Sequence, residues 1–352
     1  MRVLLIKTSS LGDVVHALPA VTEACEKIPG LQFDWMVEES FVEIPEWHPG
    51  VGRVLPVALR RWRKQPFQAL RSSEWRALRE HIKAGEYDLV IDAQGLLKSA
   101  FLVWLVGSNS VGYDRESIRE PLATLFYQQK IKVSKELHAV ERIRQLFAGA
   151  LNYSLTSSTP TYGVKPPVDE VFEPENIQYL VWLHGSTWDS KLWPEAYWIE
   201  LSQLAVDAGY EVLIPWGDGE ERKRAIRVET FVDGVTVLPQ MTLGELALVL
   251  SRAVGVVGVD GGPAHLAAAV SVPMICLYGA TRPLLTGSWG ENCHNLQGEA
   301  ACVPCLKRKC TNLSADGMSQ ACFTTLQPKQ VFQQLMTQIS SHNDGDGLRV
   351  VR

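Results

Sequence analysis

MRVLLIKTSSLGDVVHALPAV, residues 1–21, contains three consecutive signals that indicate how the chain begins to fold. The run at 2–7 is apolar, as in a buried strand; residues 8–13 are small and polar; and residues 14–21 can open a helix. A strand that ends in a short polar loop before a helix is typical of nucleotide-binding sheets. The stretch contains neither the G-x-G-x-x-G fingerprint nor a P-loop, so its loop must have another role.

The bulk properties of the chain exclude several classes of protein. A length of 352 residues favours two domains, because one hydrophobic core rarely serves so long a chain. A net charge of −5 argues against a protein that binds nucleic acid over its whole surface. No stretch is long and apolar enough to cross a bilayer, and the N-terminus lacks the pattern of a signal peptide. We therefore expect a cytoplasmic protein, in which disulfides between the seven cysteines are not expected.

Strand and helix patterns alternate in two series along the chain. The first has strands at 33–39, 87–95 and 110–114 and helices at 68–85 and 137–151; the second has strands at 179–185, 211–217, 235–239, 254–260 and 273–279 and helices at 193–209, 220–232, 241–253 and 262–270. Two βαβ series predict an α/β protein with two parallel-sheet domains. We place these domains at 1–160 and 177–325, with a linker at 161–176, a closing helix at 326–340 and a flexible tail at 341–352.

Loops that follow strands are the first places to look for function, because doubly wound sheets bind ligands beyond the carboxyl ends of their strands. In the second series, the first strand is followed by Ser186, Thr187 and Lys191, just before a helix. Hydroxyls, a lysine and a helix start together form a natural anion site. The alternative is that Ser186 or Thr187 only closes a turn.

Two further loops of the second series indicate a sugar nucleotide. Asp260 ends an apolar strand, and Gly261 and Gly262 would let a phosphate approach the backbone at a helix start. Asp260 could accept hydrogen bonds from sugar hydroxyls or could cap the helix, and His265 could touch the anion or simply be packed. Glu221 could hold a ribose diol, although glutamate is also favourable in any first helical turn. Together the loops predict one nucleotide-sugar site.

The loop at 8–13 carries a carboxylate that has two possible roles. Ser10 and Asp13 form an S-x-x-D pattern, which can be a capping box. The loop belongs to the first domain, and we expect its strand end to face the nucleotide-sugar site across a cleft. A carboxylate beside a sugar hydroxyl can act as a general base, which is the second role for Asp13.

A basic segment stands out in a chain of negative net charge. Its densest part is ALRRWRK at 58–64, where Trp62 lies among four cations. Such segregation indicates an anionic partner, namely an acidic sugar, phosphates or an anionic membrane face. The alternative is a solvated helix face, which suits Arg71, Arg76 and Arg79 better than ALRRWRK.

Motifs spread from residue 1 to about 340 resemble the lipopolysaccharide heptosyltransferases of glycosyltransferase family 9. They include MRVLLIKTSSLGDVVHALPAV, RRWRK, YDLVIDAQGLLKSA, HAVER, HGSTWDSKLWPE and VDGGPAHLAAA. The resemblance implies a GT-B fold, with two Rossmann-like domains facing a cleft. It also implies an inverting transfer of L-glycero-D-manno-heptose from ADP-heptose to the first Kdo of Kdo2-lipid A.

Other functions remain as alternatives to this transfer. Within the family, a heptosyltransferase II or III would act on an already heptosylated core. Outside it, a non-catalytic nucleotide-sugar binder would release no ADP. A nucleotide-sugar epimerase or dehydrogenase should show a G-x-G-x-x-G loop and a Tyr-x-x-x-Lys pair, and the sequence has neither.

The resemblance implies roles for individual residues. Asp13 is the implied base and Lys191 the implied catalytic cation at the leaving diphosphate. The implied donor-binding residues are Ser186, Thr187, Lys191, Glu221, Met241, Asp260, Gly261, Gly262 and His265. The implied acceptor-binding residues are Ser10, Gly12, Arg60, Arg61, Arg63, Lys64, Lys98, Arg119, His138 and Arg142.

The resemblance also implies which partners the chain has. They are ADP-heptose, Kdo2-lipid A and the anionic surface of the inner membrane, with no nucleic acid, cofactor or metal. The chain is expected to be a monomer, peripheral on the cytoplasmic face of that membrane.

Two features depart from the family pattern. Residues 260–265 read DGGPAH where other members have D-T-G-x-x-H, so a hydroxyl is lost at Gly261 and donor contacts there must come from the backbone. The cysteine-rich segment 301–323 is present in some members and missing in others, which implies that the shared chemistry does not need it. Its cysteines at 302, 305, 310 and 322 could bind zinc, but their gaps fit no common finger, and we favour reduced cysteines.

Overall fold

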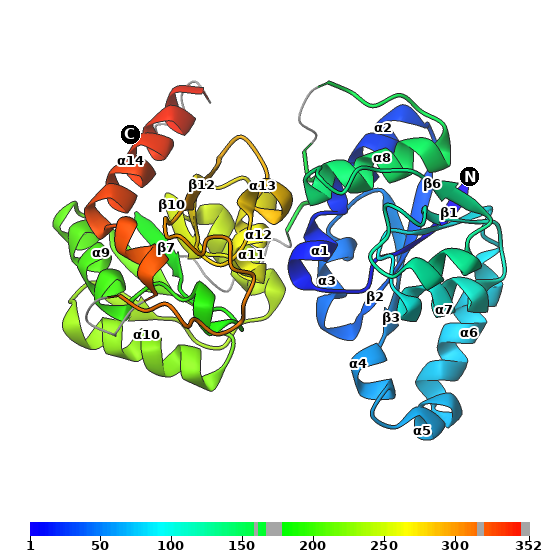
Figure 1. The fold of residues 1–352 in the computed structure, drawn as a ribbon, viewed down its shortest axis with the longest axis horizontal. Coiled ribbons are helices and arrows are strands. Elements are labelled where there is room, and N and C mark those ends of the chain that lie inside the picture. The colour runs from blue at the N-terminus through cyan, green and yellow to red at the C-terminus, as the bar shows by residue number, and fades with distance from the viewer. Residues whose placement is uncertain (158–160, 167–177, 315–319, 346–352) are drawn as a thin grey trace. The chain divides into compact units, whose positions relative to one another are not determined.

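The computed structural model describes residues 1–157, 161–166, 178–314 and 320–345 (Figure 1). The chain divides into two compact units, Met1–Lys165 and Pro166–Arg352. The boundary lies inside the stretch 161–176, for which we predicted a linker. Each unit has its own sheet and its own set of helices, and we describe each by itself.

Unit 1 is a parallel sheet of six strands in the order β3-β2-β1-β4-β5-β6. The strands are β1 (Arg2–Ile6), β2 (Gln32–Glu38), β3 (Val51–Val57), β4 (Leu89–Asp92), β5 (Ser110–Tyr113) and β6 (Gln129–Ile131). The helices are α1 (Leu11–Val15), α2 (Leu18–Lys27), α3 (Glu43–Glu46), α4 (Leu59–Trp62), α5 (Pro66–Arg71), α6 (Ser73–Gly85), α7 (Leu97–Val106) and α8 (Ala139–Leu151), with 3-10 turns η1 (Glu39–Phe41) and η2 (Pro121–Phe126). The strand order reverses between β1 and β4, where Ile6 lies opposite Asp92.

Unit 2 repeats this topology with a sheet in the order β12-β11-β10-β7-β8-β9. The strands are β7 (Tyr179–Leu183), β8 (Glu211–Ile214), β9 (Val235–Val237), β10 (Gly255–Val259), β11 (Met274–Tyr278) and β12 (Cys293–Gln297). The helices are α9 (Glu195–Asp207), α10 (Gly219–Phe231), α11 (Leu243–Arg252), α12 (Gly262–Ala269), α13 (Pro283–Thr286) and α14 (Pro328–Gly345), with 3-10 turns η3 (Asp189–Lys191) and η4 (Ala321–Thr325). Here the order reverses between β7 and β10, where Leu183 lies opposite Gly258.

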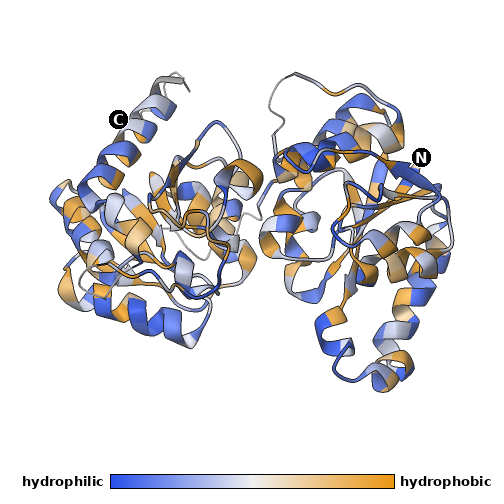
Figure 2. Ribbon diagram, viewed as in Figure 1, coloured by the Kyte–Doolittle hydropathy of each residue, from blue (hydrophilic) through white to orange (hydrophobic). Residues whose placement is uncertain are grey.

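The central strands form the core of each unit. Every residue of β7, β10 and β11 is buried, as are the last four of β1. Figure 2 shows this as hydrophobic strands inside helices whose outer faces are hydrophilic. A parallel strand needs helices on both faces of its sheet, which explains why these segments are continuous apolar runs rather than alternating ones.

The predicted α/β fold with two parallel-sheet domains is confirmed, but three strands were missed. They are β3, β6 and β12, at or near the edges of the sheets. Their sequences VGRVLPV, QKI and CHNLQ contain polar residues, Gly or Pro, and they are only partly buried. Such strands lack the apolar run that reveals a central strand, because helices do not cover them fully.

Two helix boundaries also differ from the sequence-based expectation. The helix expected at 68–85 is two helices, because Ser72 is extended between them and its hydroxyl accepts a hydrogen bond from Trp75 N–H at 3.1 Å. The closing helix, expected at 326–340, continues to Gly345 as α14, so the first part of the expected tail is helical. Residues 346–352 lie outside the described residues.

Candidate active site

The carboxyl edge of the unit 2 sheet carries a buried ion pair at the point where the strand order reverses. Lys191 Nζ lies 2.7 Å from Asp260 Oδ2, and Thr281 Oγ1 donates a hydrogen bond to the same oxygen. The two charged side chains are 15% and 8% exposed. Lys191 comes from the loop after β7, Asp260 directly follows β10, and Thr281 follows β11. One carboxylate oxygen therefore ties together three strand-end loops.

This placement overturns one of the two readings of Asp260. The helix α12 is capped by Gly261, and no side chain caps it, so the reading of Asp260 as a helix cap is wrong. Asp260 is itself only 6% exposed. Its carboxylate orients Lys191 toward the strand ends. The sequence analysis did not identify Thr281, because no sequence spacing indicates that it contacts Asp260.

The loop after β7 is held by weaker bonds. Ser186 Oγ donates to the Asp260 carbonyl oxygen at 3.4 Å and accepts from Trp188 N–H at 3.4 Å. Ser186 thus closes a turn and at the same time joins this loop to the loop after β10. Thr187 is exposed beside it.

The start of α12 approaches the same loop closely. A Cβ atom at Gly261 would lie 3.2 Å from the Gly185 carbonyl oxygen, so a side chain there would crowd the backbone. Gly262 is the first residue of α12, and His265 is buried within it. The N–H groups at the start of this helix give the edge a partial positive charge.

Glu221 lies between the ends of β7 and β8. Its Oε2 accepts a hydrogen bond from Gly217 N–H at 2.7 Å, and its own N–H donates to Asp218 Oδ1 at 2.9 Å. A Cβ atom at Gly185 would overlap the Glu221 carboxylate. Glycine at 185 is therefore what allows this carboxylate to lie against the loop after β7.

Strand order places the predicted donor residues in a row. The strands β10, β7, β8 and β9 are neighbours, and they are followed by Asp260, Ser186, Glu221 and half-buried Met241 in turn. Three steps between neighbouring strands span about 14 Å. An elongated ligand can therefore lie along this edge, with an acidic group at Glu221 and a cation at Lys191.

His184 was not singled out from the sequence, although it directly follows β7. It is 3% exposed, and neither ring nitrogen has a hydrogen-bond partner among the residues that the structure describes. Burial, reinforced by Arg224 and Arg227, lowers the pKa of His184 to about 3. The imidazole is therefore neutral at physiological pH, and its uncharged state adds nothing to the attraction of an anion.

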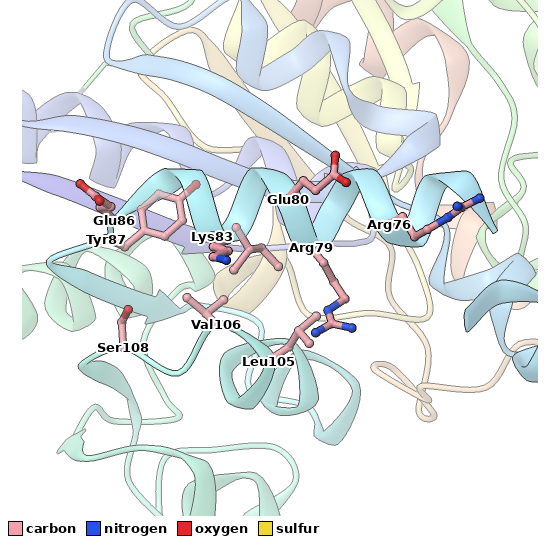
Figure 3. A pocket seen from close by; sticks show the side chains of 10 residues that line it. Arg76, Arg79, Glu80, Lys83, Glu86, Tyr87, Leu105, Val106 and Ser108 are labelled. Atoms are coloured by element: carbon pink, nitrogen blue, oxygen red, sulfur yellow. The ribbon is translucent and has the colours of Figure 1, made fainter. Parts of the chain in front are cut away.

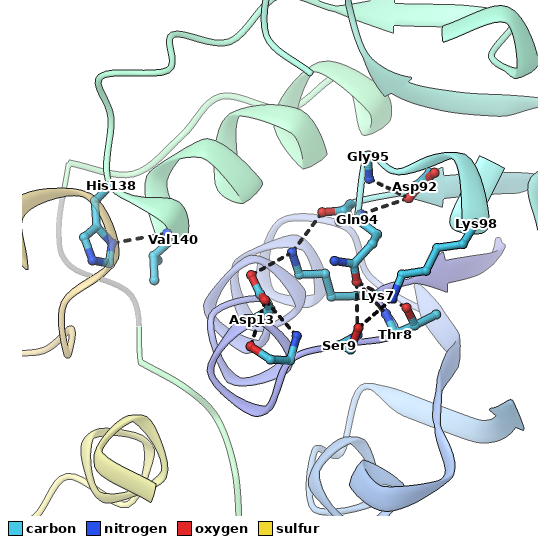
Figure 4. A network of polar contacts seen from close by, with 12 residues as sticks. Lys7, Thr8, Ser9, Asp13, Asp92, Gln94, Gly95, Lys98, His138 and Val140 are labelled. Carbon is cyan, nitrogen blue, oxygen red and sulfur yellow. Dashed lines mark hydrogen bonds and ion pairs between the residues drawn. The ribbon is translucent and has the colours of Figure 1, made fainter. Parts of the chain in front are cut away.

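The corresponding edge of unit 1 carries Asp13 (Figure 4). Asp13 Oδ2 accepts hydrogen bonds from Ser10 N–H at 2.7 Å and from Ser10 Oγ at 3.0 Å. Asp13 Oδ1 lies 3.6 Å from Lys7 Nζ, and the carboxylate side chain is 44% exposed. The cap therefore uses Oδ2, whereas Oδ1 lies on the side of Lys7. Gly12 is buried beside it in α1.

A second loop supports the loop that carries Asp13. Gln94 Oε1 accepts hydrogen bonds from Thr8 N–H at 2.9 Å and from Ser9 N–H at 3.0 Å, and Lys98 Nζ donates to Ser9 Oγ at 2.8 Å (Figure 4). Partial burial, with nearby cations, lowers the pKa of Lys98. Lys98 was predicted from the resemblance, whereas Gln94 was missed.

Asp92 explains why Gln94 is so well placed. This carboxylate is fully buried at the end of β4 and accepts hydrogen bonds from Gln94 N–H at 2.8 Å, Gly95 N–H at 3.1 Å, Ser99 Oγ at 2.8 Å and Tyr127 OH at 2.6 Å. Desolvation raises the pKa of Asp92. Asp92 is a positioning residue, because it orders the loop that in turn orders residues 8 and 9.

Of the other predicted acceptor residues, some already have partners within unit 1. Arg61 pairs with Glu39 at 2.9 Å and with Glu74 at 3.0 Å, so its charge is largely compensated. Arg142 donates to the Ser117 carbonyl oxygen at 2.7 Å. Buried His138 accepts from Val140 N–H and caps α8. The predicted cations Arg60, Arg63, Lys64 and Arg119 are exposed, as are Arg61 and Lys98.

Unit 1 also contains a cavity of about 610 Å³ between α6 and α7 (Figure 3). Arg79 and Lys83 of α6 and Leu105 and Val106 of α7 line it. Glu86 and Tyr87, which precede β4, and Ser108, which precedes β5, also line it, so the cavity lies toward the amino edge of the sheet. It is separate from the edge that carries Asp13.

Cysteines and metal ligands do not gather into a recognisable centre. All seven cysteines are free thiols. Within the described ranges, no group of three or more His, Cys, Asp or Glu side chains is placed to hold a metal ion. No helix in the same ranges is long and apolar enough to span a membrane.

Comparison with known proteins identifies relatives of the whole chain. The glycosyltransferase family 9 (heptosyltransferase) model matches residues 75–315. Lipopolysaccharide heptosyltransferase 1 of Pseudomonas aeruginosa is 50% identical over 345 residues, covering 95% of this chain and 97% of the relative. The Escherichia coli K12 protein of the same name is 48% identical over 293 residues, covering 83% and 92%.

Solved structures show the same fold. The structure described as E. coli heptosyltransferase WaaC with ADP has a TM-score of 0.85 and 43% identity, covering 96% of this chain and 100% of that chain. E. coli ADP-heptose lps heptosyltransferase II has a TM-score of 0.75 at 18% identity, covering 97% and 100%, which shows a common fold alone.

Gly185→Ala should destabilise the chain, because its methyl group would overlap the Glu221 carboxylate. The overlapping atoms are the end of a flexible side chain that can turn aside, so we expect the free energy of unfolding to fall by only about 0.5–1 kcal/mol, at the lower end for overpacked sites. Denaturant unfolding followed by circular dichroism measures this change. The matched control is Gly219→Ala, where a Cβ atom meets nothing within 4 Å. Equal stability of the two variants would show that Glu221 does not need the space at Gly185.

Proposed function

The chain belongs to glycosyltransferase family 9, the heptosyltransferases, and from this premise we propose that it transfers L-glycero-D-manno-heptose from ADP-heptose to the first Kdo of Kdo2-lipid A. The observation that carries the proposal is the buried pair of Lys191 and Asp260 at the switch point of unit 2. It presents an ordered cation beside a helix start, as a diphosphate requires. The relatives at 48–50% identity are named for the first transfer, which favours it over the second or third.

The row of residues along the edge suggests how the donor binds. The adenosine lies near Glu221 and Met241, where the Glu221 carboxylate can accept from ribose hydroxyls. The diphosphate lies against Ser186, Thr187 and the start of α12. An ammonium group has three N–H donors, so Lys191 can keep Asp260 and still contact a phosphate oxygen. With this cation and helix start in place, the donor needs no metal to hold its diphosphate.

The reaction is a direct displacement at the anomeric carbon. Asp13 takes the proton of the Kdo hydroxyl as that oxygen attacks, and the bond to the ADP phosphate oxygen breaks. The heptose configuration is inverted, giving an α-linked product. Ser10 fixes Oδ2 of Asp13, and we assign the proton to Oδ1, the oxygen that is not in the cap. Lys191 stabilises the negative charge on the departing ADP.

The acceptor assignment is tested by the release of ADP from ADP-heptose. We expect release with Kdo2-lipid A and none with a core that already carries the first heptose. The opposite result would keep the donor site and make the chain a later heptosyltransferase. Binding of ADP-heptose without release on either acceptor would make it a non-catalytic binder.

The variant Asp13→Asn distinguishes the role of Asp13 as a general base from its role as a helix cap. Asparagine keeps an oxygen that can accept from Ser10 N–H, but it cannot take a proton at neutral pH. We expect kcat to fall by roughly 10²-fold or more, with ADP affinity nearly unchanged. Turnover and calorimetric titration with ADP measure the two quantities. The control is Ser10→Ala, which keeps the Asp13 carboxylate and should retain most of the turnover. If Asp13→Asn also retains most of the turnover, Asp13 is only a helix cap.

The acceptor is a lipid, and unit 1 offers an exposed apolar surface for the membrane that contains it. We define this membrane-facing surface by Leu97, Phe101 and Trp104 of α7 and Leu122 and Leu125 of η2, which packs against α7. Trp104 is 64% exposed and Leu125 is 78% exposed. Apolar surface of this kind is unusual for a side that faces only water.

Cations flank the membrane-facing surface. A row of ring contacts leads from Trp62 of α4 through Trp75 to Phe101 and Trp104, with centroids 5.5, 6.4 and 5.7 Å apart. Exposed Arg60, Arg63 and Lys64 lie on or beside α4, and each cation near an anionic bilayer adds about 1 kcal/mol. We therefore propose that an anionic bilayer covers this surface, and that the chain works as a monomer at the cytoplasmic face of the inner membrane.

Trp104→Glu should weaken binding to anionic vesicles, because a carboxylate resists burial among lipids and is repelled by their charge. We expect the bound fraction on phosphatidylethanolamine–phosphatidylglycerol vesicles to fall roughly tenfold. Flotation measures it. The control is Phe231→Glu in unit 2, at a site 69% exposed. If both variants bind vesicles equally well, this surface does not contact the membrane. If the unaltered chain forms a dimer and Trp104→Glu is monomeric, the surface binds a second copy of the chain instead.

A further inference from the structure

The cysteine-rich segment lies directly against the loop that follows β7. Ser190 N–H donates to the Arg308 carbonyl oxygen at 3.2 Å, and Ser190 Oγ donates to the Lys307 carbonyl oxygen. Ser190 is 2% exposed and lies in η3, next to Lys191. The main chain at 307 and 308 therefore fixes the turn from which Lys191 extends.

The same segment also reaches the loop that follows β11. Leu306 N–H donates to the Ala280 carbonyl oxygen at 2.8 Å. Ala280 directly precedes Thr281, whose hydroxyl donates to Asp260. Residues 306–308 thus bridge the two loops that supply the partners of Asp260, and they act as a strap across the carboxyl edge of the sheet.

The strap brings a second cation to the diphosphate loop. The Arg308 guanidinium lies 5.6 Å from the centroid of the Trp188 ring, and Lys191 Nζ lies 4.7 Å from the same centroid. Cations are attracted to an indole ring, and both of these cations contact the ring of Trp188. Arg308 is exposed, and among the described residues no carboxylate forms an ion pair with it.

Two cations at one ring repel each other, so an anion that contacts both relieves this repulsion. Lys191 already has Asp260 as partner, whereas the Arg308 side chain donates no hydrogen bond to any residue that the structure describes, so its five N–H donors can serve such an anion. Both distances are measured to the same ring centroid, so the two cations lie at most about 10 Å apart. A diphosphate with oxygens on two phosphorus atoms, together with a flexible arginine side chain, can span such a separation.

We propose that Arg308 is a second donor-binding cation, which contacts the diphosphate of ADP-heptose, and that Ser190 is a positioning residue that holds the strap in place. This inference rests on the function proposed above and deepens it at the same site. The resemblance implied that the segment is dispensable for the shared chemistry. In this chain the segment supports the donor loop and supplies a residue to the donor site.

The test compares Arg308→Met with Arg308→Lys in the full chain. Methionine keeps an apolar stem against Trp188 but removes the charge, whereas lysine keeps the charge. We expect Arg308→Met to weaken ADP binding roughly tenfold, as the loss of one charge-assisted contact does, and Arg308→Lys to bind within about threefold of the unaltered chain. Calorimetric titration with ADP measures both, and Lys309→Ala, an exposed neighbour, is the matched control.

Steady-state kinetics separates donor binding from other effects. We expect Arg308→Met to raise KM for ADP-heptose and to leave KM for Kdo2-lipid A unchanged. Ser190→Ala, which loses the bond to the Lys307 carbonyl oxygen, should raise the donor KM in the same direction by about threefold. If Arg308 only supported the fold, Arg308→Lys would not restore ADP binding, and the KM for Kdo2-lipid A would change together with the KM for ADP-heptose.

Different results overturn different statements. If Arg308→Met binds ADP as tightly as the unaltered chain, the role of Arg308 is wrong while the heptosyl transfer stands. If Arg308→Lys binds ADP as weakly as Arg308→Met, the positive charge is not what binds the diphosphate, and the inference is also wrong. If the unaltered chain neither binds ADP nor releases it from ADP-heptose, the proposed function itself fails.

Discussion

The ion pair between Lys191 and Asp260 is the contact on which the carboxyl edge of unit 2 depends. It is almost fully buried, and a buried charge is tolerated only where a partner and hydrogen bonds compensate it. Thr281 supplies the further hydrogen bond, so three loops must be in place together for the pair to be satisfied. The loops order one another without a ligand, so the proposed donor site is largely preformed, which would reduce the cost of binding.

The repeated strand order explains the form of both candidate sites. In each unit the order reverses beside the first strand, which leaves a crevice at the carboxyl ends of two neighbouring strands. In unit 2 these ends carry the ion pair, and in unit 1 they carry Asp13 and Gln94. The two edges differ in chemistry although they share a topology. One presents cations and a helix start, as a diphosphate needs, and the other presents a carboxylate, as a general base needs.

Charge and aromatic side chains are distributed unevenly over unit 1. The basic segment at 58–64 contributes less charge than its sequence suggests, because Glu39 and Glu74 compensate Arg61. The remaining cations lie beside a row of aromatic rings that leads to exposed Trp104. The proposed lipid acceptor would account for this combination, since a bilayer attracts cations through its headgroups and accepts apolar side chains below them.

The sequence by itself determined the fold class, the central strands and the loops in which function lies. These features depend on local signals, namely apolar runs, turn residues and the rule that ligands bind at strand ends. It also identified Lys191, Asp260 and Asp13 as candidates, because each follows a strand within eight residues. The edge strands β3, β6 and β12 were not predicted, since partial burial leaves them no continuous apolar pattern.

Only the tertiary structure decided which candidates work together. The contacts of Asp260 with Lys191 and Thr281, of Gln94 with residues 8 and 9, and of Ser190 with the cysteine-rich segment join positions 21 to 117 residues apart. Sequence spacing carries no information about such pairs, because they are brought together by strand order and helix packing. Whether a charge is compensated, as in Arg61, or exposed, as in Arg308, likewise depends on neighbours that only the folded chain supplies.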